Sequence, residues 1–119
     1  MQAINPNLEY TVIELLNVSK TDIPYYPVIT GLMLVHAVCN KIGSYYQKPD
    51  ITIDDQQCLV LVWKSENTDT PIGKVVLTIP PKDIYTKQLN LVIWHSSGKF
   101  ESTTDVSIDR LAKAISGLT

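Results

Sequence analysis

The stretch Cys58-Leu59-Val60-Leu61-Val62-Trp63 gives the strongest structural signal in this chain. Six consecutive apolar residues of this kind, with β-branched and aromatic members, are typical of a strand. Such a strand would be apolar on both faces, which is the pattern of a central strand covered on both sides. We therefore expect residues 58–63 to lie in the middle of a sheet on which the rest of the fold is built.

Three further strands are predicted after this stretch, joined by short connections. Residues 73–79 form the first, which ends at Pro80-Pro81 because proline cannot donate to a strand ladder. Residues 88–95 form the next, and Ser96-Ser97-Gly98 is a hairpin turn that leads into a shorter strand at 99–103. Short links place consecutive strands side by side and antiparallel.

Before the central stretch, apolar residues recur at spacings of 3, 4, 3 and 4 at Leu32, Val35, Cys39, Ile42 and Tyr46. This spacing predicts a helix from about Val28 to about Tyr46, buried along much of its girth. Residues 19–27 form a loop, and residues 51–53 are short enough for only a minor strand. Residues 8–18 alternate roughly between apolar and polar and predict a strand, with a short helix as the competing interpretation.

The chain closes with a second predicted helix. Its apolar face comprises Ile108, Leu111, Ala112, Ile115 and Leu118. Thr104 or Asp105 would cap its start, and Gly117 would end it. The predicted order is thus β-α-β-β-β-β-α. This is an α+β fold with an antiparallel sheet of four to five strands and two helices packed on it, in one domain covering residues 1–119.

Composition excludes several functional classes. No apolar run reaches the roughly 18 residues that a membrane span needs, and the first residues lack a basic start and an apolar segment, so no secretory signal is expected. The two cysteines favour a reducing, cytoplasmic location. The formal charge is −2, and nine of the ten basic residues are scattered lysines, with Arg110 the single arginine. We therefore expect binding to neither nucleic acid nor membrane.

Residues able to perform chemistry are few. His36, Cys39, Cys58 and His95 could in principle bind zinc or form a cysteine-histidine pair. Each of them lies within or beside an apolar run, which favours packing in the core over metal binding. Phosphate-binding glycine motifs are absent from the sequence. The sequence therefore predicts no metal, no cofactor and no catalysis.

Adhesive surface residues give the remaining signal, because tyrosine is enriched at protein interfaces. The candidate partner-binding residues are Tyr25, Tyr26, Tyr45, Tyr46, Asp50, Asp54 and Asp55. They predict a non-catalytic intracellular module that binds another protein, with a basic surface as the expected complement. The specific form we expect is a small inhibitor or immunity-type protein that occludes a toxin or nuclease.

Two alternatives remain open from the sequence. One is a homodimeric chaperone or adaptor that pairs through a sheet edge or through the helix at 28–46. The other is a small-molecule sensor or minor enzyme with a pocket between sheet and helices, for which His36, Cys39, Cys58 and Trp94 are the candidate residues.

Overall fold

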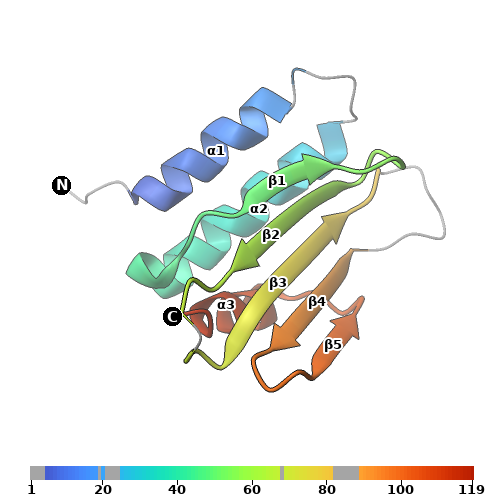
Figure 1. Ribbon diagram of the computed structural model, residues 1–119. Helices are drawn as coiled ribbons and strands as arrows, with labels where there is room; N and C mark the ends of the chain where they lie inside the picture. The colour runs from blue at the N-terminus through green and yellow to red at the C-terminus, as the bar shows by residue number, and fades with distance from the viewer. Residues whose placement is uncertain (1–4, 19, 21–24, 68, 82–88) are drawn as a thin grey trace.

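The computed structural model describes residues 5–18, 20, 25–67, 69–81 and 89–119. Figure 1 shows how these residues form three α-helices, a short 3₁₀ helix and five strands. In chain order they are α1 (Pro6–Val18), α2 (Tyr25–Ile42), the 3₁₀ helix η1 (Gly43–Tyr45), β1 (Asp50–Ile53), β2 (Leu59–Lys64), β3 (Ile72–Ile79), β4 (Asn90–His95), β5 (Phe100–Thr103) and α3 (Ile108–Ser116). The predicted α+β class with an antiparallel sheet is confirmed.

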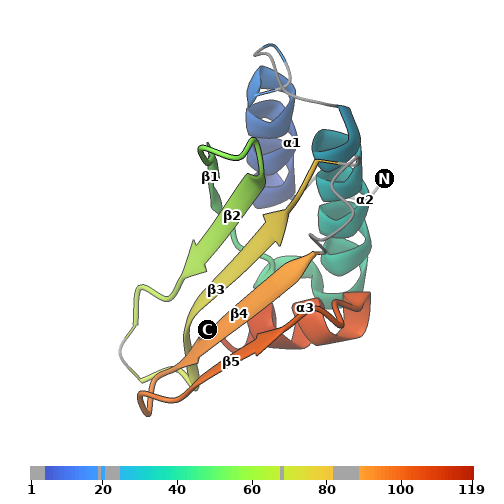
Figure 2. The same ribbon diagram turned by 90° about the vertical axis from the view of Figure 1, so that its right-hand side faces the viewer.

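The strands form one open sheet in the order β1-β2-β3-β4-β5, and every neighbouring pair is antiparallel. Each strand therefore lies beside its neighbour in sequence, as the short connections predict. All three helices lie on the same side of this sheet, which Figures 1 and 2 show from two directions. In the described ranges, no helix or strand covers the other side.

Alternation along β2 shows the consequence of this one-sided packing. Leu59, Leu61 and Trp63 are fully buried beneath the helices. Val60 and Val62 point to the opposite side and are only half-buried. The expectation that residues 58–63 are covered on both sides therefore does not hold among the residues that the structure describes.

Residues 8–18, predicted as a strand, form most of α1. Asn5 begins this helix, because its side-chain oxygen accepts hydrogen bonds from the backbone N–H groups of Asn7 and Leu8 at 2.9 and 3.2 Å. Pro6 then occupies the first turn, where a missing N–H is tolerated. The residues facing the core recur at helical spacing: Leu8, Thr11, Leu15 and Val18. The order is consequently α-α-β-β-β-β-β-α, with three helices rather than two.

The second helix is shifted toward the N-terminus relative to its predicted range. It begins at Tyr25 instead of Val28, and Pro27 lies in its first turn. It ends at Ile42 instead of Tyr46, because Gly43 adopts a left-handed backbone with φ of 54°. The 3₁₀ turn that follows directs the next segment back toward the core.

A β-bulge at Gly73 decides which face the start of β3 presents. Ile72 pairs with His95 and Lys74 pairs with Trp94, so Gly73 is an extra residue on this strand. The bulge turns Ile72 into the core, where it packs against the end of α3. A Cβ atom on Gly117 would lie 2.5 Å from Ile72 Cγ1, so close packing requires this glycine. Lys74 consequently points to the side of the sheet that the helices leave bare.

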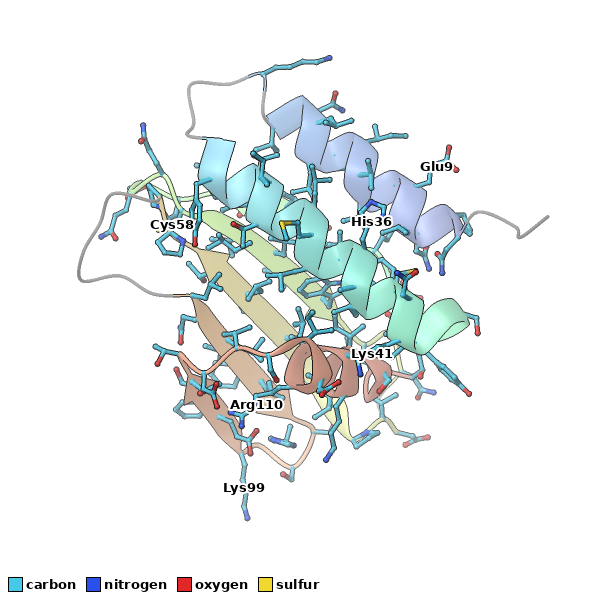
Figure 3. All side chains as sticks on the ribbon, turned by 180° about the vertical axis from the view of Figure 1, so that it is seen from behind. Glu9, His36, Lys41, Cys58, Lys99 and Arg110 are labelled. Carbon is cyan, nitrogen blue, oxygen red and sulfur yellow. The ribbon has the colours of Figure 1, made fainter. Side chains whose placement is uncertain are left out.

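The last helix begins and is anchored differently from the prediction, although its end at Gly117 is confirmed. Ser107 caps it, since its hydroxyl oxygen accepts a hydrogen bond from the Arg110 N–H at 3.1 Å. Asp109 forms an ion pair with Lys41 at the end of α2. Figure 3 shows Lys41 reaching toward α3, so this pair joins two helices of the layer.

Tyr46 fixes α1 and the segment after η1 against the sheet. Its side chain is fully buried. The Thr11 hydroxyl donates to the Asn7 carbonyl at 2.7 Å, which leaves its oxygen to accept from the Tyr46 hydroxyl at 3.0 Å. One residue further on, the Gln47 carbonyl accepts from the Trp63 ring N–H at 2.9 Å. Burial raises the pKa of Tyr46 far above its usual value, because the ionised phenolate would lose its hydration.

We predict that Tyr46→Phe lowers the free energy of unfolding by about 1 kcal/mol at neutral pH, through loss of the buried hydrogen bond. This difference in unfolding free energy between the variant and the wild type should shrink above pH ~10, the ordinary tyrosine pKa. There the unfolded wild type releases the Tyr46 proton while the folded form keeps it, so wild-type stability falls by up to about 1.4 kcal/mol per pH unit. Urea denaturation at a series of pH values measures both effects.

Tyr45→Phe is the matched control, because Tyr45 is the exposed neighbour in η1. It should change stability by less than about 0.5 kcal/mol and keep the alkaline slope of the wild type. An alkaline slope in Tyr46→Phe equal to that of the wild type would show that Tyr46 does not carry the effect.

Candidate functional site on the open face of the sheet

The side of the sheet away from the helices, here called the open face, carries an aliphatic centre. Val62 of β2, Val76 of β3 and Val92 of β4 are paired directly across three adjacent strands. Val60 lies on the same face, opposite Thr78. All four valines are half-buried in the described structure. Directly paired β-branched side chains form a flat, continuous apolar surface.

A second row crosses four strands beside these valines. It consists of Lys64, Lys74, Trp94 and Phe100, each paired with the next, and is called the lysine–aromatic row below. The rings of Trp94 and Phe100 lie 5.0 Å apart between centroids and are tilted by 31°. Trp94 is 42% exposed and Phe100 is 61% exposed. Two large aromatic side chains therefore pack on each other at the surface rather than in the core.

This row is unfavourable for the folded chain in water. Lys64 and Lys74 are directly opposite one another, and like charges in that position destabilise a sheet. Neither lysine forms an ion pair with any residue that the structure describes. The acidic residue on the same face is Asp50, at the start of the edge strand β1. Folding alone gives no reason for these residue types at these positions.

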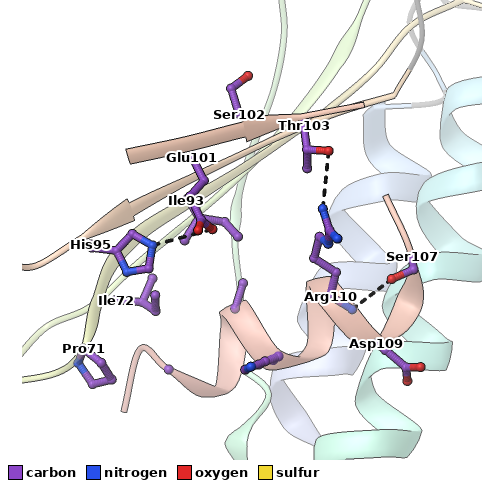
Figure 4. Close-up of a pocket in the computed structure, with 13 residues that line it drawn as sticks. Pro71, Ile72, Ile93, His95, Glu101, Ser102, Thr103, Ser107, Asp109 and Arg110 are labelled. Carbon is purple, nitrogen blue, oxygen red and sulfur yellow. Dashed lines mark hydrogen bonds and ion pairs between the residues drawn. The ribbon is translucent and has the colours of Figure 1, made fainter. Parts of the chain in front are cut away.

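The helix side of the sheet contains a separate cleft, shown in Figure 4. It lies between α3 and the strands β4 and β5, has a volume of about 900 Å³, and includes Ile72 and Ile93 in its lining. Polar side chains in its lining contact one another. Glu101 lies 3.6 Å from His95, and the Arg110 guanidinium donates to the Thr103 hydroxyl at 3.4 Å.

The tyrosines predicted to bind a partner are separated. Tyr26 lies at the start of α2, about 24 Å of helix separates it from Ile42, and Tyr45 lies beyond that end. Tyr26 and Tyr45 are exposed, whereas Tyr46 is fully buried. Tyr25 belongs to α2, but its side chain lies outside the described part of the structure.

The predicted acidic residues are also divided between two places. Asp50 begins β1, whereas Asp54 and Asp55 follow its other end. Asp54 organises the turn, since its side-chain oxygen accepts from the N–H groups of Gln56 and Cys58, both at 2.9 Å. Gln57 between them has a left-handed φ of 61°. The six candidate residues whose side chains the structure describes therefore do not form one surface.

The residues considered for metal binding or covalent catalysis are likewise dispersed. Cys39 and Cys58 are buried, and His95 lines the cleft. Figure 3 shows His36 on the outer side of the helix layer and Cys58 at a distance from it. Among the residues described, no three His, Cys, Asp or Glu side chains are grouped for a metal ion. Burial raises the pKa of the Cys39 thiol, which disfavours the reactive thiolate.

Comparisons with known protein families, with curated proteins and with solved structures give no match to this chain. None of the helices in the described ranges has the length and apolar content required to cross a membrane. The function is therefore inferred from the geometry of the chain itself. The lysine–aromatic row was missed from sequence, although an aromatic residue beside each end of the Ser96-Ser97-Gly98 turn was a signal for it.

Proposed function

We propose that this protein is a non-catalytic module that binds another protein through the open face of its sheet. The observation that carries the proposal is the lysine–aromatic row beside the paired valines, on a face that the described chain leaves uncovered. We further propose that the partner presents apolar side chains together with carboxylates. Occlusion of that partner, as by an inhibitor or immunity-type protein, is the mode of action we favour.

Trp94 and Phe100 supply the aromatic contacts of the proposed interface. Tryptophan is among the residues that contribute most binding energy when buried at the centre of an interface, and aromatic residues are enriched there. Five strands about 4.8 Å apart and about six residues long give a face of roughly 500 Å². A standard interface covers about 800 Å² on each partner. The partner should therefore also reach the rim, including the exposed hairpin at Lys99.

Lys64 and Lys74 supply the positive charge of the proposed interface. A carboxylate placed between them would relieve their mutual repulsion and gain two charge-assisted contacts. We therefore propose a partner that carries carboxylates in place of the basic partner expected from the sequence. The support is that Lys64 and Lys74 lie side by side on this face, whereas Asp50 lies at one end of β1 and Asp54 and Asp55 follow its other end. The aliphatic valines favour a protein over a nucleic acid, and the single arginine, Arg110, lies in the cleft on the other side.

We predict that the double substitution Trp94→Ala and Phe100→Ala abolishes capture of the partner from native lysate. A matched double variant, Tyr26→Ala and Tyr45→Ala, removes two exposed rings elsewhere and should capture it normally. With the captured protein purified, affinity for the first variant should fall at least about tenfold, the usual scale for losing aromatic anchors. Equal capture by both variants would refute the proposal.

The lysines give an independent prediction. Lys64→Gln with Lys74→Gln should raise the free energy of unfolding by a few tenths of a kcal/mol at low salt, since the like-charge pair is removed. The same change should weaken binding of the purified partner and reduce the dependence of its affinity on salt. Lys20→Gln, an exposed lysine after α1, is the control. Binding of a single-stranded oligonucleotide in place of a protein, lost in these variants, would contradict the proposed partner class.

A second candidate function is supported by the cleft of about 900 Å³ between α3 and β4–β5. Its volume and its mixture of apolar and polar lining residues fit a small organic ligand, as a sensor would bind. The expected result is a ligand that raises the melting temperature of the wild type in a thermal-shift screen and has no effect on Arg110→Ala. Lys20→Ala should respond like the wild type, and a screen without any hit would remove this candidate.

A further inference from the structure

We infer that a second copy of this chain packs on the outer side of α2, along the seam Tyr26, Ile29, Met33, His36 and Asn40. This inference goes beyond the proposed function, because the seam lies on the helix side of the molecule and the open face lies on the other (Figure 2).

Apolar exposure is concentrated on this side of the helix layer. Met33 is 68% exposed and Ile29 is 52% exposed, although both lie within a regular helix. On the neighbouring helix α1, Ile13 and Leu16 are each about half exposed, at 50% and 49%. Figure 3 shows α1 and α2 side by side on the outside of the molecule. Apolar side chains on adjacent helices of this kind mark an interaction surface.

The charge pattern of α2 supports the same conclusion. No Asp, Glu, Lys or Arg occurs from residue 25 to residue 40. A helix on the surface of a soluble protein normally places charged residues on its outer face, whereas one that is apolar all round is buried. The outer face of α2 thus has the composition of a covered helix.

The spacing of the exposed positions is that of a helix–helix seam. Tyr26, Ile29, Met33, His36 and Asn40 follow one another at intervals of 3, 4, 3 and 4 residues. This is the a/d repeat with which one helix inserts side chains between those of another. The core-facing residues of α2 lie on a different stripe, so the repeat is not needed to pack this helix on its own sheet.

A second copy is the occupant that fits this surface. In a symmetric pair the same patch meets itself, and the α2 seam, which has no Asp, Glu, Lys or Arg, can do so without repulsion. Glu9 of α1 is exposed on the same face as Ile13 and Leu16, so charge is confined to the margin of the patch. The open face would instead bring Lys64 and Lys74 of both copies into one interface. Two helices side by side offer roughly 400–500 Å². Two copies therefore bury roughly 800–1,000 Å² in total, which is at or just below the lower limit of about 1,000 Å² for a specific interface. The dimer should therefore be weak and reversible.

Met33 is the middle member of the seam, so it lies next to its own copy whether the two helices run parallel or antiparallel. Because the helix layer and the open face are on opposite sides of the sheet, such a dimer keeps both open faces accessible. The dimer would then present two binding faces directed away from each other.

Sedimentation velocity of the purified chain, from low micromolar to millimolar concentration, tests the inference. The wild type should shift from monomer to dimer, and Met33→Glu should weaken the dimer at least about tenfold, because it places like charges together in a desolvated interface. Met33 is largely exposed in the monomer, so this variant should fold normally. Tyr45→Glu changes an exposed apolar residue outside the seam and should dimerise like the wild type.

A cysteine at the centre of the seam gives a second, independent readout. Met33→Cys should form an intermolecular disulfide under mild oxidation, whereas Tyr45→Cys should not, and the natural cysteines Cys39 and Cys58 are buried. A wild type that stays monomeric at millimolar concentration would overturn the inference, including the case in which it binds lipid vesicles instead. A dimer that survives Met33→Glu and is lost in Trp94→Ala would place self-association on the open face and also overturn it.

Discussion

Packing of all three helices on one side of a five-stranded meander is the constraint on which the rest of this structure depends. It divides every strand into a covered set and an uncovered set of alternating residues, as Leu61 and Val62 show on β2. The bulge at Gly73 preserves this division by turning Ile72 inward and Lys74 outward. The extra residue thereby lets Ile72 pack under α3 although Lys74, two positions along the same strand, lies on the open face.

The helix layer is held in register on the sheet by a few specific polar contacts within an apolar core. Tyr46 bonds to Thr11 of α1, and the Trp63 ring N–H of β2 bonds to the segment that follows Tyr46. The ion pair of Lys41 with Asp109 of α3 is exposed and contributes little to this register. Apolar contacts are tolerant of sliding, whereas a buried hydrogen bond is satisfied in one arrangement. The two hydrogen bonds therefore fix the position of the helix layer on the covered face of the sheet.

The sheet was predictable from sequence because its strands are separated by clear turn signals, such as Pro80-Pro81 and Ser96-Ser97-Gly98. The first helix was not predictable, because its short apolar pattern fits both strand alternation and helical spacing. What distinguishes the two is that Asn5 caps the helix, and this contact is seen only in the structure. The predicted surface of tyrosine and aspartate residues required each of these side chains to point outward. For Tyr45 and Tyr46 the direction is set by the left-handed turn at Gly43, which sends Tyr46 inward and leaves Tyr45 outside.

In two places the sequence predicts apolar residues to be buried that the structure leaves partly exposed. Residues 58–63 have the composition of a strand covered on both sides, and α2 has that of a helix buried along much of its girth. The described residues cover one side of each. Apolar surface left in water favours nonspecific association and, on a sheet, aggregation. A sequence that keeps apolar residues at both places, in ordered rows and at helix-seam spacing, is best explained if each surface is covered by a specific partner. The uncharged seam suits a copy of itself, and the lysines of the open face require something else.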